Sequence, residues 1–207
     1  MFRVISATAL AAGLLFAAAP AAAEPFGAFI DLCVAKKGDR AAAQAAATDL
    51  GWSEIPKEAL GEAADDDLRD AVLYINFDLA SGPTTDDAPV LLLTGWSDGE
   101  EMMGAESVVV EVCGVISPDL DLAQAEERVT ALVGERAAAP DEGRMWLYSM
   151  DNGRYVSEAA LEEFAGGEIE AAARQRDLYV ILSADQDGTG VLMLGAVRSV
   201  LRLREGL

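Results

Sequence analysis

The run Glu106–Ile116 constrains the fold more than any other part of the chain. It reads Glu-Ser-Val-Val-Val-Glu-Val-Cys-Gly-Val-Ile and is the richest β-branched run in the sequence. β-branched side chains favour strands, and successive residues of a strand point to opposite faces of a sheet. One face carries Val108, Val110, Val112 and Ile116, and the other carries Val109, Glu111, Cys113 and Val115. Both faces are largely apolar, so we expect this strand to be covered on both sides.

The chain contains two cysteines, Cys33 and Cys113, which lie far apart in the sequence. In an exported protein such a pair usually forms a disulfide. Closing a loop of about 80 residues stabilises the folded state by about 4.5 kcal/mol in the chain-entropy model. A catalytic redox pair is the alternative, but it favours C-x-x-C spacing beside a helix start, which this sequence lacks. The sequence therefore predicts a structural disulfide between Cys33 and Cys113.

Residues 1–23 have the pattern of a secretory signal peptide. Arg3 supplies a short basic segment, Ala9–Ala19 is apolar, and Ala21-Ala22-Ala23 is a small-residue cleavage signal before Glu24. A transmembrane anchor fits less well, because the apolar run is short for a span of about 20 residues. We therefore expect cleavage near Ala23 and a location in the periplasm or outside the cell.

Residues 24–207 are long enough for one domain with a sizeable core, and we expect a single domain there. Without the signal peptide, which contains one basic residue, 36 acidic residues stand against 14 basic ones. A chain this acidic repels nucleic acid and anionic membrane surfaces, so neither is an expected partner. No later run of 18 apolar residues predicts a membrane-embedded segment. Solubility explains the charge most simply, and cation binding or a basic partner is the alternative.

Helical patterns dominate the first part of the mature chain. Residues 24–37 place Phe26, Phe29, Ile30, Cys33 and Val34 on one apolar stripe. Asp39 is a candidate N-cap for an alanine-rich helix that runs to Leu50. Residues 58–80 also have apolar spacing of three and four and are predicted helical, with Asp65-Asp66-Asp67 as the cap of their main portion.

Part of this pattern resembles a group of small secreted proteins of alphaproteobacteria. The residues that carry the resemblance are Phe29 and Cys33, then Gly38-Asp39, the alanine-rich helix, Gly51-Trp52 and Pro56, together with the Cys113 segment. These proteins pair their first cysteine with a later one in a strand and have no assigned activity. The resemblance therefore implies export and the disulfide, and it implies no chemistry.

The second half of the chain contains mostly strand patterns. Strands are predicted at 89–96, 106–116, 144–150, 154–156, 178–183 and 190–197, with loops at 97–105 and 137–142. Helices are predicted at 121–134, capped by Asp121, and from 158 to about 165, with a second piece after Gly166-Gly167 that runs to Arg176. Asn152-Gly153 is a strong hairpin signal. We expect an α+β fold with an antiparallel sheet of about five strands, N-terminal helices, and one or two helices packed on the sheet.

The sequence contains no histidine, and this excludes several chemistries. Ser-His-Asp and Cys-His catalysis and histidine ligation of zinc are not available. No phosphate-binding glycine motif is present, and we expect no cofactor. A pair of carboxyl groups could hydrolyse a glycosidic bond. Glu111 is the best single acid for this, because a partly apolar environment raises the pKa of a carboxyl group. A rim position or a pairing with arginine explains Glu111 more simply.

Residues Asp185, Asp187 and Thr189, followed by Gly190, imitate the first half of a calcium-binding EF-hand loop. Position twelve of such a loop needs a bidentate glutamate, and Ala196 stands there. The residues after Gly190 also have a strand pattern where an EF-hand needs a helix. We interpret this stretch as a β-turn rich in Asp and Gly, with a weak calcium site as the alternative.

Three functional hypotheses follow. The first is a non-catalytic interaction or ligand-binding domain of the cell envelope, with an envelope protein as its partner and a contact surface at Trp96, Met102 and Met103. The second is a carboxylate-dependent hydrolase of envelope glycan or peptide. The third is a weak calcium-binding envelope protein. The absence of a recognisable catalytic motif favours the first, and the oligomeric state stays open.

Overall fold

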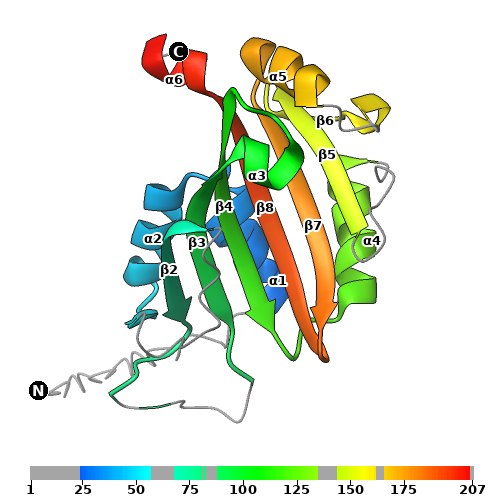
Figure 1. The fold of residues 1–207 in the computed structure, drawn as a ribbon. Coiled ribbons are helices and arrows are strands. Elements are labelled where there is room, and N and C mark those ends of the chain that lie inside the picture. The colour runs from blue at the N-terminus through cyan, green and yellow to red at the C-terminus, as the bar shows by residue number, and fades with distance from the viewer. Residues whose placement is uncertain are drawn as a thin grey trace, which may run out of the picture.

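An eight-stranded antiparallel sheet forms the centre of the molecule (Figure 1). A computed structural model describes residues 24–56, 68–80, 82, 88–134, 144–161 and 166–205. The strands lie in the order β1 (Ser53–Ile55), β2 (Arg69–Ile75), β3 (Leu91–Asp98), β4 (Val108–Ser117), β8 (Thr189–Ser199), β7 (Leu178–Gln186), β5 (Arg144–Asp151) and β6 (Arg154–Ser157). The predicted α+β class is confirmed, and the predicted number of about five strands is wrong.

The two missed strands, β1 and β2, explain most of this difference. The prediction of a helix at 58–80 is wrong for its second half, because Arg69–Ile75 pairs with β3. Leu73, Tyr74 and Ile75 are all buried, as consecutive residues are in a strand that is covered on both faces. Spacing of three and four predicts a helix there, but pairing with β3 overrides the local pattern. The predicted cap at Asp65–Asp67 lies outside the described residues.

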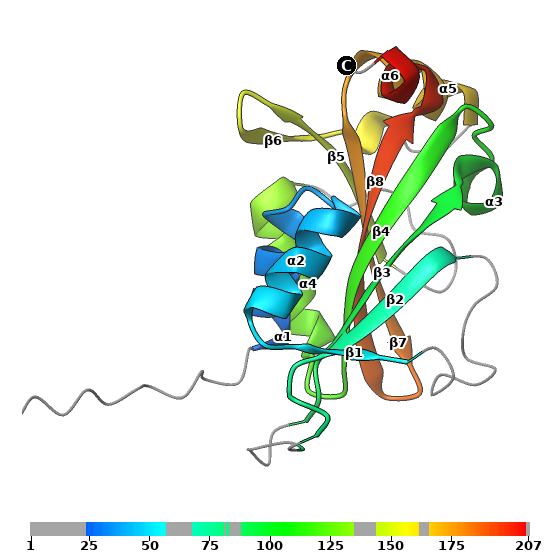
Figure 2. The same ribbon diagram turned by 90° about the vertical axis from the view of Figure 1, so that its left-hand side faces the viewer.

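The central strand β4 has the side-chain directions that the sequence predicts. It lies between β3 and β8, with Cys113 opposite Thr94 on one side and Leu194 on the other. We call the face of the sheet that carries Cys113 the disulfide face. Helices α1 (Pro25–Ala28), η1 (Phe29–Val34), α2 (Arg40–Asp49) and α4 (Leu122–Val133) cover this face (Figure 2). Its core includes Phe29, Leu32, Trp146, Tyr179, Leu192 and Leu194.

The predicted disulfide between Cys33 and Cys113 is confirmed. The two Cα atoms lie 5.4 Å apart, and both side chains are fully buried. Helix η1 is a π-helix, in which Ala35 N–H donates to the carbonyl oxygen of Ile30 over a distance of 2.8 Å. Phe29, Leu32 and Cys33 lie three and four residues apart, so they share one face of the helix, and all three are buried in the core. The disulfide therefore fixes the first helical segment to the centre of the sheet.

Two predicted helix caps are also confirmed. The Asp39 carboxylate accepts a 2.8 Å hydrogen bond from Ala42 N–H at the start of α2. The Asp121 carboxylate accepts a 3.1 Å hydrogen bond from Gln124 N–H at the start of α4. Each bond satisfies a donor that has no partner within the helix. These caps depend on neighbours in sequence, so the sequence alone can specify them.

The opposite face of the sheet carries α3 (Gly99–Met103) and α5 (Gly166–Gln175), and α6 (Val200–Glu205) follows β8 at the same end of the sheet. The loop predicted at 97–105 contains α3. The second helical piece predicted to run to Arg176 is α5, which begins at Gly166, and residues 162–165 before it lie outside the described part. The helix predicted from 158 begins as a short 3-10 turn, η4 (Ala159–Leu161). Residues 137–142 lie outside the described part. No helix within the described residues is long and apolar enough to cross a membrane.

Gly38 allows the loop between η1 and α2 to lie directly on β8. Its φ is +67°, and a Cβ there would lie 2.7 Å from the Ala196 Cβ. We expect Gly38→Ala to lower the free energy of unfolding by about 2 kcal/mol, through backbone strain and this collision. Gly51 is the matched control, because its φ is +80° but nothing lies within 4 Å of its Cβ position. Urea denaturation should show a smaller loss for Gly51→Ala, and equal losses would contradict the steric account.

Ser199, at the end of β8, is a second position where the direction of the change in stability can be predicted. Its hydroxyl is buried and has no hydrogen-bond partner within the described residues. Because a buried polar group without a partner costs stability, Ser199→Ala should leave stability unchanged or raise it by up to about 1 kcal/mol. Ser183→Ala is the comparison, because the Ser183 hydroxyl donates a 2.9 Å bond to the buried Glu126 carboxylate. Thermal denaturation should rank Ser199→Ala above Ser183→Ala, and the reverse order would refute this explanation.

Candidate functional site

A row of mostly aromatic and charged residues crosses the disulfide face. On β4 it passes through Glu111, two residues before Cys113. Six strands contribute to it, and neighbouring members are directly paired in the sheet: Tyr148, Tyr179, Ala196, Glu111, Trp96 and Arg69. The row therefore brings together side chains from β5, β7, β8, β4, β3 and β2. Its two ends differ in character, because the β5–β7 end is buried and the β2–β3 end is exposed.

The exposed end is built on a β-bulge in β2. Arg69 pairs with Trp96 and Val72 pairs with Thr94, so β2 has one more residue than β3 between these pairs. Asp70, inside the bulge, has a φ of +48°, which is uncommon for a residue other than glycine. Bulges of this kind redirect side chains and occur often beside active sites.

The bulge brings two consecutive side chains to the same tryptophan. In a regular strand, Arg69 and Asp70 would point to opposite faces. Here the Arg69 guanidinium lies 4.9 Å from the centre of the Trp96 ring, and the Trp96 indole N–H donates a 2.9 Å bond to the Asp70 carboxylate. Gly95 lies opposite the bulge, and a Cβ there would be 2.5 Å from the Leu68 side chain. Any larger residue next to Trp96 would therefore require the Leu68 side chain to move.

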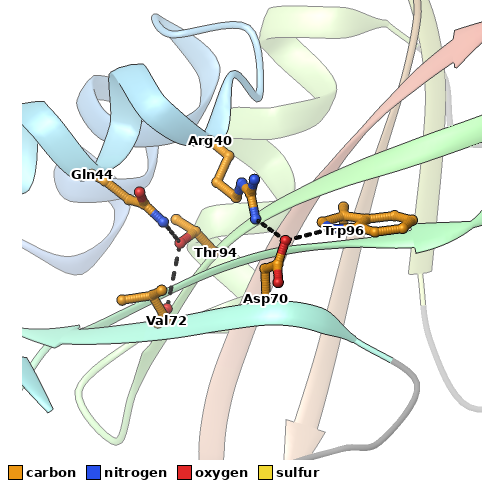
Figure 3. A network of polar contacts seen from close by, with 6 residues as sticks. All are labelled: Arg40, Gln44, Asp70, Val72, Thr94 and Trp96. Atoms are coloured by element: carbon orange, nitrogen blue, oxygen red, sulfur yellow. Dashed lines mark hydrogen bonds and ion pairs between the residues drawn. The ribbon is translucent and has the colours of Figure 1, made fainter. Parts of the chain in front are cut away.

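Arg40 completes the arrangement from the helical layer. Its guanidinium donates a 3.2 Å hydrogen bond to the same Asp70 oxygen that the Trp96 indole contacts (Figure 3). We call Arg40, Arg69, Asp70 and Trp96 the Asp70 site. The Asp70 side chain is 69% exposed and the Arg69 side chain 46% exposed, so the site lies at the surface. Arg69 also pairs with Asp98 at 2.5 Å, and this holds its guanidinium beside the ring.

Arg198, two residues after Ala196 on β8, contacts Glu111 in the middle of the row. Burial raises the pKa of the Glu111 carboxyl group, the nearby Arg198 charge opposes this, and the Asp39 carboxylate adds to it. The nearest atoms of the Glu111–Arg198 pair lie 3.9 Å apart. Arg198 also donates a 2.9 Å bond to the Lys37 carbonyl oxygen. This pair therefore fastens the loop after η1 to the sheet.

Glycoside hydrolysis would need a second carboxyl group that works with Glu111. Asp39 is the acid whose charge raises the Glu111 pKa, and its carboxylate caps α2. The contacts of Glu111 and Asp39 are thus those of residues that hold the helical layer in place. The arrangement at Glu111 gives the hydrolase hypothesis no positive support.

The buried end of the row consists of stacked tyrosines. The rings of Tyr148 and Tyr179 are stacked with their centres 5.1 Å apart, and Tyr155 meets Tyr148 edge-on at 5.5 Å. Burial, and to a lesser extent the neighbouring tyrosines, raise the pKa of Tyr148 far above its ordinary value. Tyr148 therefore stays neutral at physiological pH. These rings pack between β5, β6 and β7 and contribute to the core.

The structure separates the residues predicted to form one contact surface. Trp96 lies on the disulfide face, in the row with Glu111. Met103 belongs to α3 and packs on the opposite face, against the cluster that contains Val108 and Val110. Met102, also in α3, is 41% exposed. Trp96 is thus part of the Asp70 site, and the two methionines are not.

The predicted calcium-binding stretch forms the hairpin between β7 and β8. Asp187 and Gly188, with φ of +54° and +82°, make a two-residue turn. The Asp185 carboxylate accepts a 2.9 Å bond from Gly188 N–H, and Thr189 pairs with Gln186. Within the described ranges, no three acidic or cysteine side chains gather into a group that could hold a metal ion.

Arg40, Arg69 and Asp70 are site residues that the sequence did not predict. The adjacent charges of Arg69-Asp70 before the apolar run 71–75 are the signal that could have suggested the end of a strand. The chain matches no protein-family model, no curated protein and no solved structure.

Proposed function

We propose that this chain is an exported, non-catalytic binding domain of the bacterial cell envelope that holds an envelope protein at the Asp70 site. One observation carries the proposal: a bulge with a strained aspartate brings an arginine to the face of a half-buried tryptophan ring and a carboxylate to the N–H at its edge. Backbone of this kind is uncommon outside turns, costs free energy and clusters at functional sites.

The composition of the Asp70 site supports protein binding. Tryptophan and arginine are enriched among the residues that dominate binding energy at protein interfaces. Trp96 offers apolar area, and Arg40, Arg69 and Asp70 offer directed polar contacts around it. Their mutual contacts hold these side chains in one arrangement before a partner arrives, so little conformational entropy is lost on binding.

Export is supported by three separate features. Residues 1–23 have the pattern of a signal peptide, the disulfide suits an oxidising compartment, and the resemblance to secreted alphaproteobacterial proteins points the same way. Glu24, the first residue after the expected cleavage, already serves the fold. Its carboxylate accepts a 2.8 Å bond from Gly27 N–H and pairs with Arg128 at 3.1 Å.

Site-specific photo-cross-linking in living cells tests the binding proposal. A photoreactive amino acid placed at Glu101, which lies 3.7 Å from Arg69, should give one discrete adduct with an envelope protein. Trp96→Ala should lower the adduct yield at least about tenfold, as expected for an interface residue worth 2 kcal/mol or so. The matched control probe is Val156, which is 41% exposed on β6, at the other edge of the sheet.

The pattern of adducts decides the outcome. Equal adducts from the Glu101 and Val156 probes, or an adduct that Trp96→Ala leaves unchanged, would refute binding at the Asp70 site. Export is tested separately by cell fractionation and N-terminal sequencing of the purified protein. We expect periplasmic or secreted material that begins at Glu24, and a cytoplasmic product that keeps residues 1–23 would contradict export.

A further inference from the structure

Helix α2 contacts strands β2 and β3 through two side chains one helical turn apart. Arg40 binds the Asp70 carboxylate directly, and Gln44 lies four residues later on the same face of α2. The Gln44 amide donates a 2.9 Å hydrogen bond to the Thr94 hydroxyl (Figure 3). Thr94 is fully buried and Gln44 is half-buried, so this bond is partly shielded from water.

Thr94 in turn contacts the strand where the bulge ends. Its hydroxyl donates a 3.4 Å bond to the Val72 carbonyl oxygen, and Val72 is the first residue after the bulge that pairs again with β3. Thr94 also pairs directly with Cys113, so it is held from the other side by the strand that carries the disulfide. The Thr94 hydroxyl therefore links α2 to Val72, where β2 resumes regular pairing with β3 after the bulge.

We propose that Gln44 and Thr94 are positioning residues, which hold the bulge so that Asp70 meets the Trp96 indole. Thr94 is buried and Gln44 is half-buried, and neither side chain contacts the Trp96 indole directly among the bonds that the structure gives them. They act through Val72, and they make the geometry of the Asp70 site depend on where α2 lies on the sheet. The functional meaning of this coupling rests on the proposed binding at the Asp70 site, whereas the coupling itself is a property of the fold.

The indole N–H signals in NMR spectra of the tryptophan-labelled protein test the coupling. The chain has three tryptophans, and each signal is assigned by a Trp→Phe substitution. We expect Gln44→Ala and Thr94→Val to shift the Trp96 signal, because its bond to Asp70 changes. The Trp146 indole, which donates a 3.0 Å bond to the Thr130 hydroxyl, is an internal reference that should stay in place.

Conservative and neighbouring variants separate positioning from general destabilisation. Thr94→Ser keeps the hydroxyl and should leave the Trp96 signal near its wild-type position. Thr48→Val removes another α2 hydroxyl, which bonds to the Gln44 carbonyl oxygen and to the Tyr74 side chain of β2 but not to Thr94. This variant should have no effect on the Trp96 signal. If Thr94→Val does not fold, Gln44→Ala and Thr94→Ser still decide the question. An unmoved Trp96 signal in Gln44→Ala, or equal shifts of Trp96 and Trp146, would overturn the proposal.

A second readout distinguishes this inference from the proposed function. With the probe at Glu101, Gln44→Ala should lower the adduct yield about fivefold, as expected for the loss of one positioning hydrogen bond. A shifted Trp96 signal with no adduct in the wild-type protein would refute the binding proposal and leave the positioning role intact. A wild-type adduct whose yield Gln44→Ala leaves unchanged would overturn the coupling between α2 and binding.

Discussion

Replacing both Cys33 and Cys113 with alanine is expected to lower the free energy of unfolding by about 4.5 kcal/mol. The disulfide closes a loop of 80 residues and joins the first helical segment to the central strand. Without it, the unfolded chain gains the conformational freedom that the cross-link removes. Urea denaturation followed by tryptophan fluorescence measures the change, and the low-denaturant region should show a less cooperative start as η1 loosens.

The single variants provide the control for this experiment. If the cross-link is responsible, Cys33→Ala alone should already lose most of the stability, and adding Cys113→Ala should change little. The two cysteines are fully buried, so each alanine also removes some packing. Losses that simply add, each near half of the total, would show that packing and not the cross-link explains the effect.

Replacing Glu158 with glutamine is expected to lower the free energy of unfolding at neutral pH by about 3 kcal/mol, because it breaks charge-assisted hydrogen bonds in a partly buried position. The Glu158 carboxylate accepts 2.7 Å bonds from two nitrogens of the Arg176 guanidinium and from the Ser149 hydroxyl. It follows β6 directly and links the start of η4 to the end of α5.

The lowered pKa of Glu158 determines how the stability difference between wild type and Glu158→Gln changes with pH. Burial raises the pKa of Glu158, but the hydrogen bonds from Arg176 and Ser149, together with the Arg176 charge, outweigh burial and leave the pKa below its ordinary value. The ionised carboxylate therefore stabilises the fold above its unfolded-state pKa of about 4.3, and this contribution is lost as the pH falls through the lower folded-state pKa. The difference between wild type and Glu158→Gln should accordingly shrink as the pH drops below about 4.

Glu127→Gln serves as the matched control, because Glu127 lies exposed on α4. We expect a change within about 0.5 kcal/mol at every pH for this variant. A Glu158→Gln deficit that stays constant from neutral pH down to pH values of about 3 would contradict the assignment of the lowered pKa to this carboxyl group.

The features that the sequence determined are those set by neighbours along the chain or by a unique pair. Asp39 and Asp121 cap their helices because the donors they satisfy lie three residues away. Asn152-Gly153 makes its hairpin because both residues tolerate positive φ. Cys113 is the only other cysteine in the chain with which Cys33 can pair. The β-branched run 106–116 strongly favours a buried strand.

The tertiary structure alone decided the Asp70 site and the number of strands. Residues 69–75 have spacing that fits a helix, and only pairing with β3 makes them a strand. The bulge exists because β2 must place one extra residue opposite Gly95, and no local pattern encodes that register. Trp96 and Met103 are close in sequence but lie on opposite faces, because the chain passes from the end of β3 into α3 on the far side. Sequence neighbours thus specify caps, turns and the central strand, whereas the functional arrangement depends on contacts between segments that meet only in the folded sheet.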